Sequence, residues 1–153
     1  MTIEALISGL QNQNLRVPKI HYENVRRFTM TGSESGKNRD EVPFDRYVDV
    51  WWNALCIGVQ EGRRTQVDPQ DWHTFVRAGE VLPTNPWRLF HLQLLAVGET
   101  GSTDILTKPG ELIGIANEFA ATGLPLILNE VLGSEVPIWA VTKFMESRVV
   151  DDR

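Results

Sequence analysis

Hydrophobic residues recur at steps of three and four over much of this chain, which predicts a mainly helical protein. The strongest pattern begins at Phe44, continues through Trp51 and Leu55, and stops near Gly62. Close to its middle this segment is apolar on almost all sides, which is typical of a helix buried on several sides. We therefore expect residues 44–61 to form the central, buried helix of the fold.

Prolines mark the starts of later elements. A proline is tolerated in the first turn of a helix because the N–H that it lacks would have no partner there. Four prolines each follow, within three residues, a side chain that can cap a helix: Asp68–Pro69, Asn85–Pro86, Thr107–Pro109 and Ser134–Pro137. We expect a helix to start at each of these points. The clearest helical periodicity covers residues 86–97, 110–122, 125–132 and 137–147.

One apolar run is interrupted in its middle. Gly123 and Pro125 stand inside the stretch from residue 110 to residue 132. Glycine lowers helix propensity, and proline removes a backbone hydrogen bond. The sequence therefore predicts two helices there, with a break or kink between them.

The first 43 residues show weaker patterns. Apolar residues at helical spacing from Ile3 to Leu10 predict a short amphipathic helix. Residues 17–31 mix charges with β-branched and aromatic side chains, which favours an extended segment or a short strand. Residues 31–42 are rich in glycine, serine and charge, and they predict an exposed loop.

The length and composition fit one folded domain. The chain has 153 residues, of which 42% are hydrophobic and 23% charged, as in ordinary globular proteins. We expect a single domain over residues 1–153, in which residues 1–43 precede a helical core at 44–147. The predicted fold class is mainly α: a compact helical domain around a buried central helix, with an extended N-terminal segment and an exposed loop near 31–42.

The single cysteine and the N-terminus favour a cytoplasmic protein. Cys56 cannot form an internal disulfide, so a disulfide scaffold is excluded, and its apolar neighbours favour a buried, inert thiol over a reactive one. The N-terminus lacks the basic and apolar regions of a signal peptide. The apolar runs, such as residues 124–128, are shorter than a membrane span.

Charge is spread unevenly. The first 64 residues contain nine Lys and Arg against eight Asp and Glu, whereas the remainder contains six against twelve. A strongly basic nucleic-acid footprint is therefore absent. If DNA is touched, the contact should come from the basic residues of the first half, since the acidic second half would repel phosphate: Arg26, Arg27, Lys37, Arg39, Arg63 and Arg64. The structural alternative is that cations such as Arg63 simply suit the carboxyl end of the central helix.

No motif for phosphate binding is complete. Gly32 to Lys37 resembles a phosphate-binding loop, but only three residues separate its glycines, and Asn38 stands where a hydroxyl should bind magnesium. A solvated loop is the better interpretation. No nucleotide or other cofactor is expected.

Metal and acid–base chemistry have weak candidates. His21, His73 and His91 lie far apart, without the spacing of metal ligands. Asp45 and Asp49 are four residues apart on the predicted central helix, so a magnesium or acid–base pair stays an alternative. Acidic residues also favour a first helical turn for electrostatic reasons, which we prefer. We predict no metal site and no catalytic residue.

Tryptophan is abundant, with five residues in this length. Trp51 and Trp52 are consecutive on the predicted central helix, so their side chains point about 100° apart. A small domain has little core to offer one helix on all sides, and tryptophan is a common interface anchor. We therefore expect Trp51 and Trp52 to contribute to an interface in a homo-oligomer or hetero-complex.

Two short motifs resemble the DndE family, the small subunits of bacterial DNA phosphorothioation systems. They are Trp52–Cys56 (WNALC) and Trp87–Phe90 (WRLF), the latter followed by the apolar residues 94–97. The segment 118–131 is similar in position to the closing helices of that family, and the resemblance covers roughly residues 44–132. It implies an all-helical fold, homo-oligomers, and a non-catalytic role beside DNA-modifying or DNA-restricting partners. The family is thought to bind nicked DNA through lysines, and this chain departs from it by having few.

Our leading hypothesis is a non-enzymatic accessory subunit of a prokaryotic DNA-modification or anti-phage defence assembly. It would act through protein–protein contacts and, where the basic residues allow, DNA-backbone contacts. One alternative is a metal-dependent nuclease-type enzyme that uses Asp45 and Asp49. The other is a phage or structural interaction subunit without DNA contact.

Overall fold

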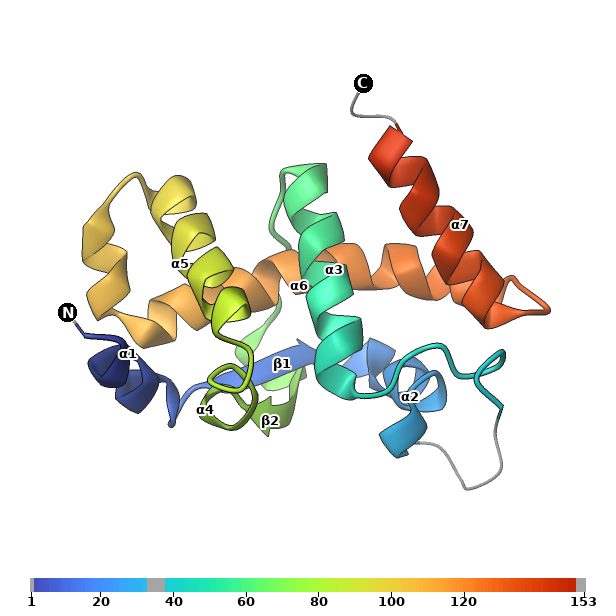
Figure 1. The fold of residues 1–153 in the computed structure, drawn as a ribbon, viewed down its shortest axis with the longest axis horizontal. Coiled ribbons are helices and arrows are strands. Elements are labelled where there is room, and N and C mark those ends of the chain that lie inside the picture. The colour runs from blue at the N-terminus through green and yellow to red at the C-terminus, as the bar shows by residue number, and fades with distance from the viewer. Residues whose placement is uncertain (1, 33–37, 151–153) are drawn as a thin grey trace.

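Helices dominate the computed structural model, which describes residues 2–32 and 38–150 (Figure 1). In this part of the chain the helices are α1 (Ile3–Leu10), α2 (Lys19–Arg27), α3 (Tyr47–Glu61), α4 (Ala78–Val81), α5 (Pro86–Thr100), α6 (Pro109–Leu132) and α7 (Pro137–Val150). Short 3-10 turns lie at Met30–Gly32, Pro69–Asp71 and Thr103–Thr107. The strands β1 (Asn14–Pro18) and β2 (Trp72–Arg77) form an antiparallel pair. The prediction of a mainly α fold around a buried central helix is confirmed.

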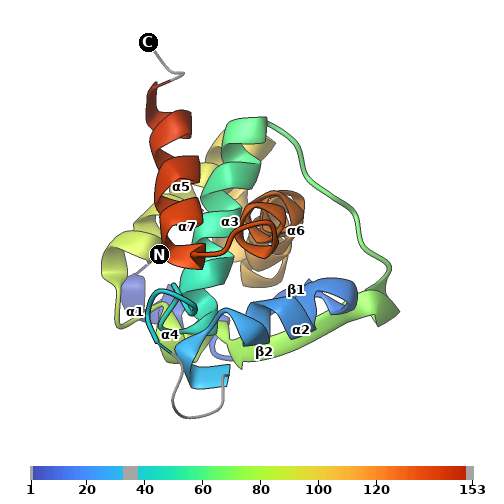
Figure 2. The same ribbon diagram turned by 90° about the vertical axis from the view of Figure 1, so that its right-hand side faces the viewer.

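The central position belongs to α6 rather than to the segment 44–61. In Figure 1, α6 runs behind α3 and α5 across the width of the molecule, and Figure 2 looks almost along its axis. The helices α3, α5 and α7 lie on one side of it, while α2 and the strand pair lie below. Most of its side chains from Leu112 to Val131 are buried. The helix α3 crosses α6 and is buried mainly on the side that faces it.

The contact between α3 and α6 is made backbone to backbone. A Cβ atom added at Gly58 would lie 1.9 Å from the carbonyl oxygen of Phe119, and one added at Gly123 would lie 1.8 Å from that of Ala54. Both distances are far inside van der Waals contact, so only glycine fits at either place. Gly123, which we interpreted as a helix breaker, is therefore where the two helices touch.

The predicted break in the long apolar run is wrong. α6 continues without interruption from Pro109 to Leu132, with Pro125 inside it. A proline costs a helix one hydrogen bond, but neighbouring buried side chains can outweigh that loss when they hold the helix against the core. Leu124, Ile127 and Leu128 are each at most 2% exposed. Tertiary packing overrides the local signal here.

In the first 43 residues the predicted helix is present as α1 (Ile3–Leu10), but the predicted extended segment at 17–31 is wrong. The extended segment is only β1, and residues 19–27 form the helix α2 instead of continuing as a strand. Tyr22 and Val25, three residues apart, face inward on α2, whereas Ile20 is 82% exposed. This exposed isoleucine hides the helical pattern. Of the predicted loop at 31–42, residues 33–37 lie outside the described residues, Asn38–Glu41 are exposed, and Val42 is buried.

The strand β2 was not predicted. We expected a helix after Asp68–Pro69, but those residues start only a 3-10 turn, which leads into Trp72–Arg77. β2 pairs with β1 in a register that sets Leu15 opposite Val76 and Val17 opposite His73. Because the partner strand lies more than 50 residues away in the chain, no local pattern announces the pairing.

One described helix, α6, is long and apolar enough to cross a membrane. We expected the apolar runs, such as residues 124–128, to be shorter than a membrane span, and the continuous helix Pro109–Leu132 exceeds that expectation. Within the most apolar 18-residue window of α6, 72% of the residues are buried inside the protein. The helix uses its apolar surface to pack the core.

Candidate functional site

The two consecutive tryptophans differ in burial. Trp51 is fully buried, and its indole Nε1 donates a hydrogen bond to Oδ1 of Asn117 on α6, at 3.2 Å. The prediction that Trp51 contributes to an interface is thus wrong, because the core encloses its whole side chain. Trp52 is only half-buried and turns toward α5, so it stays an interface candidate.

Trp52 belongs to an aromatic cluster, defined here as Trp52, Trp87, Arg88 and His91. The rings of Trp52 and Trp87 meet edge to face, with centroids 5.3 Å apart, and His91 lies 5.9 Å from Trp87 in the same manner. The guanidinium of Arg88 lies 5.4 Å from the Trp52 ring and 5.1 Å from the Trp87 ring. Edge-to-face rings and a cation over an indole both add stability beyond burial alone. The cluster therefore joins α3 to α5 firmly.

Arg88 is the unusual member, since only 8% of it is exposed. Its Nη2 donates a hydrogen bond to Oδ1 of Asp49, at 3.1 Å. Asp49 in turn accepts from the backbone N–H of Arg46 at the start of α3. Within the described part of the chain, Nε and Nη1 of Arg88 are buried and have no hydrogen-bond partner. Two of the three nitrogens of this guanidinium are therefore without a hydrogen-bond partner among the described residues.

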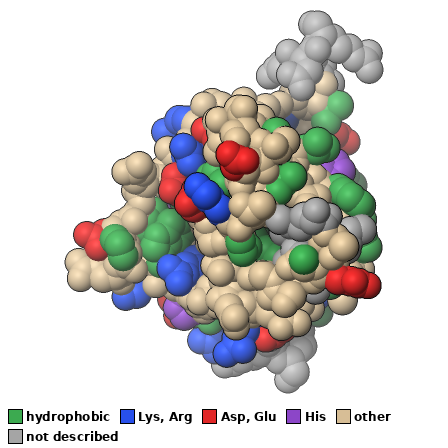
Figure 3. Space-filling model, turned by 90° about the vertical axis from the view of Figure 1, so that its left-hand side faces the viewer, with side chains coloured by type: hydrophobic (Ala, Val, Ile, Leu, Met, Phe, Trp, Pro, Cys, Tyr) green, Lys and Arg blue, Asp and Glu red, His purple; other side chains and the backbone are tan. Residues whose placement is uncertain are grey.

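The outer side of α5 carries an apolar surface, called here the α5 patch, made of Trp87, Phe90 and Leu94. These side chains follow at steps of three and four, and they are 48%, 51% and 71% exposed. Figure 3 shows hydrophobic side chains near a histidine at its right-hand edge, where α5 lies. The patch thus continues outward from the aromatic cluster.

A small pocket opens between α3 and α5, next to this patch. Its volume is about 220 Å³, and it is lined by Trp52, Leu55, Cys56, Val59, His91 and Leu95. The lining is almost entirely apolar. We call it the α3–α5 pocket.

Cys56 is exposed, so the expectation of a buried thiol is wrong. The helical spacing that buries Leu55 turns the next residue outward toward the pocket. Burial of the thiol by the surrounding side chains still raises the pKa of Cys56, which keeps the thiol protonated at neutral pH. A protonated thiol is a weak nucleophile.

The described basic candidates at the two ends of α3 do not form one patch. Arg26 and Arg27 end α2, which lies beside the start of α3, whereas Arg63 and Arg64 follow its far end (Figure 1). A helix of 15 residues is about 22 Å long, which separates the two pairs. Lys37 lies outside the described residues.

Arg39 and Arg64 are paired with carboxylates. Arg39 contacts Asp45 at 2.6 Å, and Arg64 contacts Glu99 at 3.1 Å and Glu118 at 3.6 Å. Carboxylates beside an arginine reduce its attraction for phosphate. The affinity for DNA near Arg39 and near Arg64 should therefore be lower than the sequence suggested.

The two candidate carboxylates lie in different settings. α3 begins at Tyr47, so Asp45 precedes the helix and does not share a helix face with Asp49. Asp45 pairs with Arg39, while Asp49 pairs with Arg88. Among the described residues, no group of three or more His, Cys, Asp or Glu side chains could hold a metal ion.

The three histidines have structural partners or partial burial. His73 on β2 stacks on the ring of Tyr22, with centroids 3.6 Å apart. Nδ1 of His91 lies 2.6 Å from the backbone oxygen of Trp87, one helical turn earlier. His21 on α2 is half-buried, and burial lowers the pKa of its imidazole below the ordinary 6.5.

The lowered pKa of His21 makes stability depend on pH. Below pH 6.5 the unfolded chain binds a proton at His21 that the folded protein resists, so the free energy of unfolding should fall as the pH drops below 6.5. We expect His21→Gln to lose less stability than the wild type between pH 7.5 and pH 5.5 in urea titrations. The matched control is His91→Gln, which removes an exposed imidazole. An equal loss in wild type and His21→Gln would contradict this assignment.

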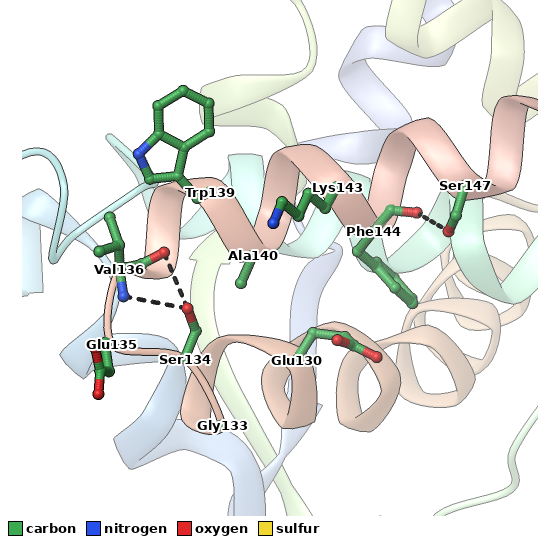
Figure 4. Close-up of a pocket in the computed structure, with 10 residues that line it drawn as sticks. All are labelled: Glu130, Gly133, Ser134, Glu135, Val136, Trp139, Ala140, Lys143, Phe144 and Ser147. Carbon is green, nitrogen blue, oxygen red and sulfur yellow. Dashed lines mark hydrogen bonds between the residues drawn. The ribbon is translucent and has the colours of Figure 1, made fainter.

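A second hollow lies between the end of α6 and α7 (Figure 4). Its volume is about 690 Å³, and its lining includes Glu130, Ser134, Lys143 and Phe144. In Figure 4 the Trp139 ring points away from α6, whereas Ala140 and Phe144 turn toward it. The groove is broad and mixes one cation with two carboxylates, so its charges do not converge on one ligand group.

Comparisons with known proteins add no relative. No family model matches the chain, and no curated protein or solved structure matches it either.

Proposed function

We propose that the protein is a non-enzymatic accessory subunit that works by binding other protein chains through the α5 patch. The observation that carries this proposal is the exposed run of Trp87, Phe90 and Leu94 beside the aromatic cluster. Exposed apolar side chains that lie together on one face, rather than singly, are typical of interaction sites. Tryptophan at such a site is a frequent source of binding energy.

The charges near the patch favour a protein partner over nucleic acid. Of the two charged residues on α5, Arg88 is buried and Glu99 is paired with Arg64. Phosphate backbones need several exposed cations along their path. The face around α5 offers none from this helix, so we assign any DNA contact to basic residues elsewhere, such as those near Arg26 and Arg63.

The setting that we propose is a prokaryotic DNA-modification or anti-phage assembly in the cytoplasm. Its basis is the resemblance to the DndE family. The two motifs that carry the resemblance, Trp52–Cys56 and Trp87–Phe90, meet in the aromatic cluster. This contact supports the resemblance. In this proposal the protein forms a homo-oligomer or a hetero-complex, and any DNA contact is secondary.

The test compares two variants that introduce charge at different exposed apolar places. Phe90→Glu/Leu94→Glu puts two charges on the α5 patch, whereas Ile20→Glu puts a charge on an isolated exposed isoleucine of α2. Both changes leave the core intact, so both proteins should fold. We expect the wild type and Ile20→Glu to exceed the 17.3 kDa monomer mass in light scattering or to retain a partner in pull-downs. The patch variant should lose that association.

The opposite result is equally clear. A wild-type protein that stays strictly monomeric at micromolar concentration, and retains no partner, would refute the proposal. Association that survives in the patch variant would place the interface elsewhere.

A further inference from the structure

We propose that the α5 patch and the α3–α5 pocket bind an acidic amphipathic peptide segment of a partner protein, whose carboxylate pairs with Arg88. This inference rests on the proposed function and specifies the chemistry of the partner. The apolar side chains of the segment would cover Phe90 and Leu94 and enter the pocket, while its carboxylate would reach the guanidinium.

The charge of Arg88 is the reason for an acidic partner. Burying a cation with unpaired donors has a substantial free-energy cost. Arg88 uses Nη2 on Asp49, and its Nε and Nη1 are buried without a partner. A guanidinium has five N–H donors and binds carboxylates well. A second carboxylate would therefore accept hydrogen bonds from the Arg88 nitrogens that have no partner within the described part of the monomer.

Arg88 lies directly beside the surface that the segment would cover. Its guanidinium is 5.4 Å from the ring of Trp52, which lines the pocket, and 5.1 Å from Trp87, which belongs to the patch. Burial raises the pKa of the Cys56 thiol, and the charge of Arg88 acts in the opposite direction. The cation is thus within electrostatic reach of a second residue that lines the pocket.

In this proposal the ring of Trp87, which lies against the guanidinium of Arg88, moves when the segment binds. It is 48% exposed and is held by edge-to-face contacts with Trp52 and His91. Such contacts contribute about 1 kcal/mol each, so a bound segment that replaces them can shift the ring. The shift would uncover the guanidinium for the incoming carboxylate.

The pocket suits one apolar side chain better than a base or a lipid headgroup. A dry cavity of about 150 Å³ holds one benzene molecule, so 220 Å³ has room for a leucine or phenylalanine side chain. Its lining supplies a single polar ring, His91, and no cation. An apolar anchor with one acidic neighbour matches this combination.

The experiment selects peptides from a random twelve-residue phage library on the wild-type protein, with counter-selection on Phe90→Glu/Leu94→Glu. We expect the selected peptides to contain aspartate or glutamate beside leucine, phenylalanine or tryptophan. One selected peptide is then synthesised with its acidic residue and with the matching amide. The amide form should bind the wild type about tenfold to a hundredfold more weakly, as measured by calorimetry.

A variant of Arg88, tested with the same two peptides, completes a double-mutant cycle. In Arg88→Gln the two peptides should bind with affinities within about twofold of each other, because the charge that distinguishes them is gone. If Arg88→Gln does not fold, the comparison of the two peptides on the wild type still decides the matter.

Each result has one meaning. Peptides that require the α5 patch but bind equally in acid and amide form would overturn this inference and leave the proposed function standing. Failure to select any patch-dependent peptide would overturn it as well, while the light-scattering test decides the proposed function independently. Selected peptides that match segments of this chain would show that the occupant is a second copy, which also contradicts a separate acidic partner.

Discussion

Replacing Gly58 with alanine should destabilise the protein by about 3 kcal/mol or more, at the upper end of overpacking effects. The added Cβ would lie 1.9 Å from the carbonyl oxygen of Phe119, and backbone cannot yield as a side chain can. α3 and α6 would have to separate along their contact. In thermal unfolding the midpoint should fall by roughly 6–12 °C. Gly123→Ala should behave in the same way, because its Cβ would meet the oxygen of Ala54.

The matched control is Gly98→Ala on α5. A Cβ at Gly98 would meet nothing within 4 Å, so the substitution brings only the higher helix propensity of alanine. It should stabilise the protein by about 1 kcal/mol. If Gly58→Ala were as well tolerated as Gly98→Ala, the close crossing of α3 and α6 would be incorrect.

Replacing Asn117 with alanine should cost about 3 kcal/mol. Its Oδ1 accepts hydrogen bonds from the backbone N–H of Arg16 at 2.9 Å and from Nε1 of Trp51 at 3.2 Å. Its Nδ2 donates to the backbone oxygen of Asn14 at 3.0 Å. This one buried side chain on α6 thus joins β1 and α3, and its loss leaves three groups without partners. Urea unfolding followed by tryptophan fluorescence measures the change.

Asn129→Ala serves as the comparison, since Asn129 is an exposed asparagine on the same helix. Its stability should stay within about 0.5 kcal/mol of the wild type. Equal effects at the two positions would mean that the Asn117 network does not hold these elements together.

The candidate site was only partly predictable. The consecutive tryptophans led us to expect both Trp51 and Trp52 at an interface, whereas Trp51 is enclosed by the core and Trp52 lies beside α5. Which tryptophan faced outward depended on how α3 lies on α6, and that orientation buried Trp51. The α5 patch was missed, because the spacing of Trp87, Phe90 and Leu94 reads as an ordinary core stripe when the neighbours of the helix are unknown.

The burial of Arg88 could not be predicted from the sequence either. An arginine within an apolar helical segment gives no sign that it is buried. Its enclosure results from Asp49 and Trp52, about 40 residues earlier in the chain. A hydrogen bond between distant segments depends on tertiary geometry, and periodicity carries no information about it.

The sequence by itself determined the helical character of the protein and the places of its main helices. The apolar spacing from Tyr47 to Glu61, the proline at the start of α5, and the proline at the start of α7 are local signals, and each helix forms where its signal lies. Only the tertiary structure decided that α6 runs unbroken through Pro125. It also decided that β1 finds a distant partner, and that α5 keeps an apolar face outside. The physical reason is that helix formation depends on neighbours within about four residues, whereas burial and strand pairing depend on segments far apart in the chain.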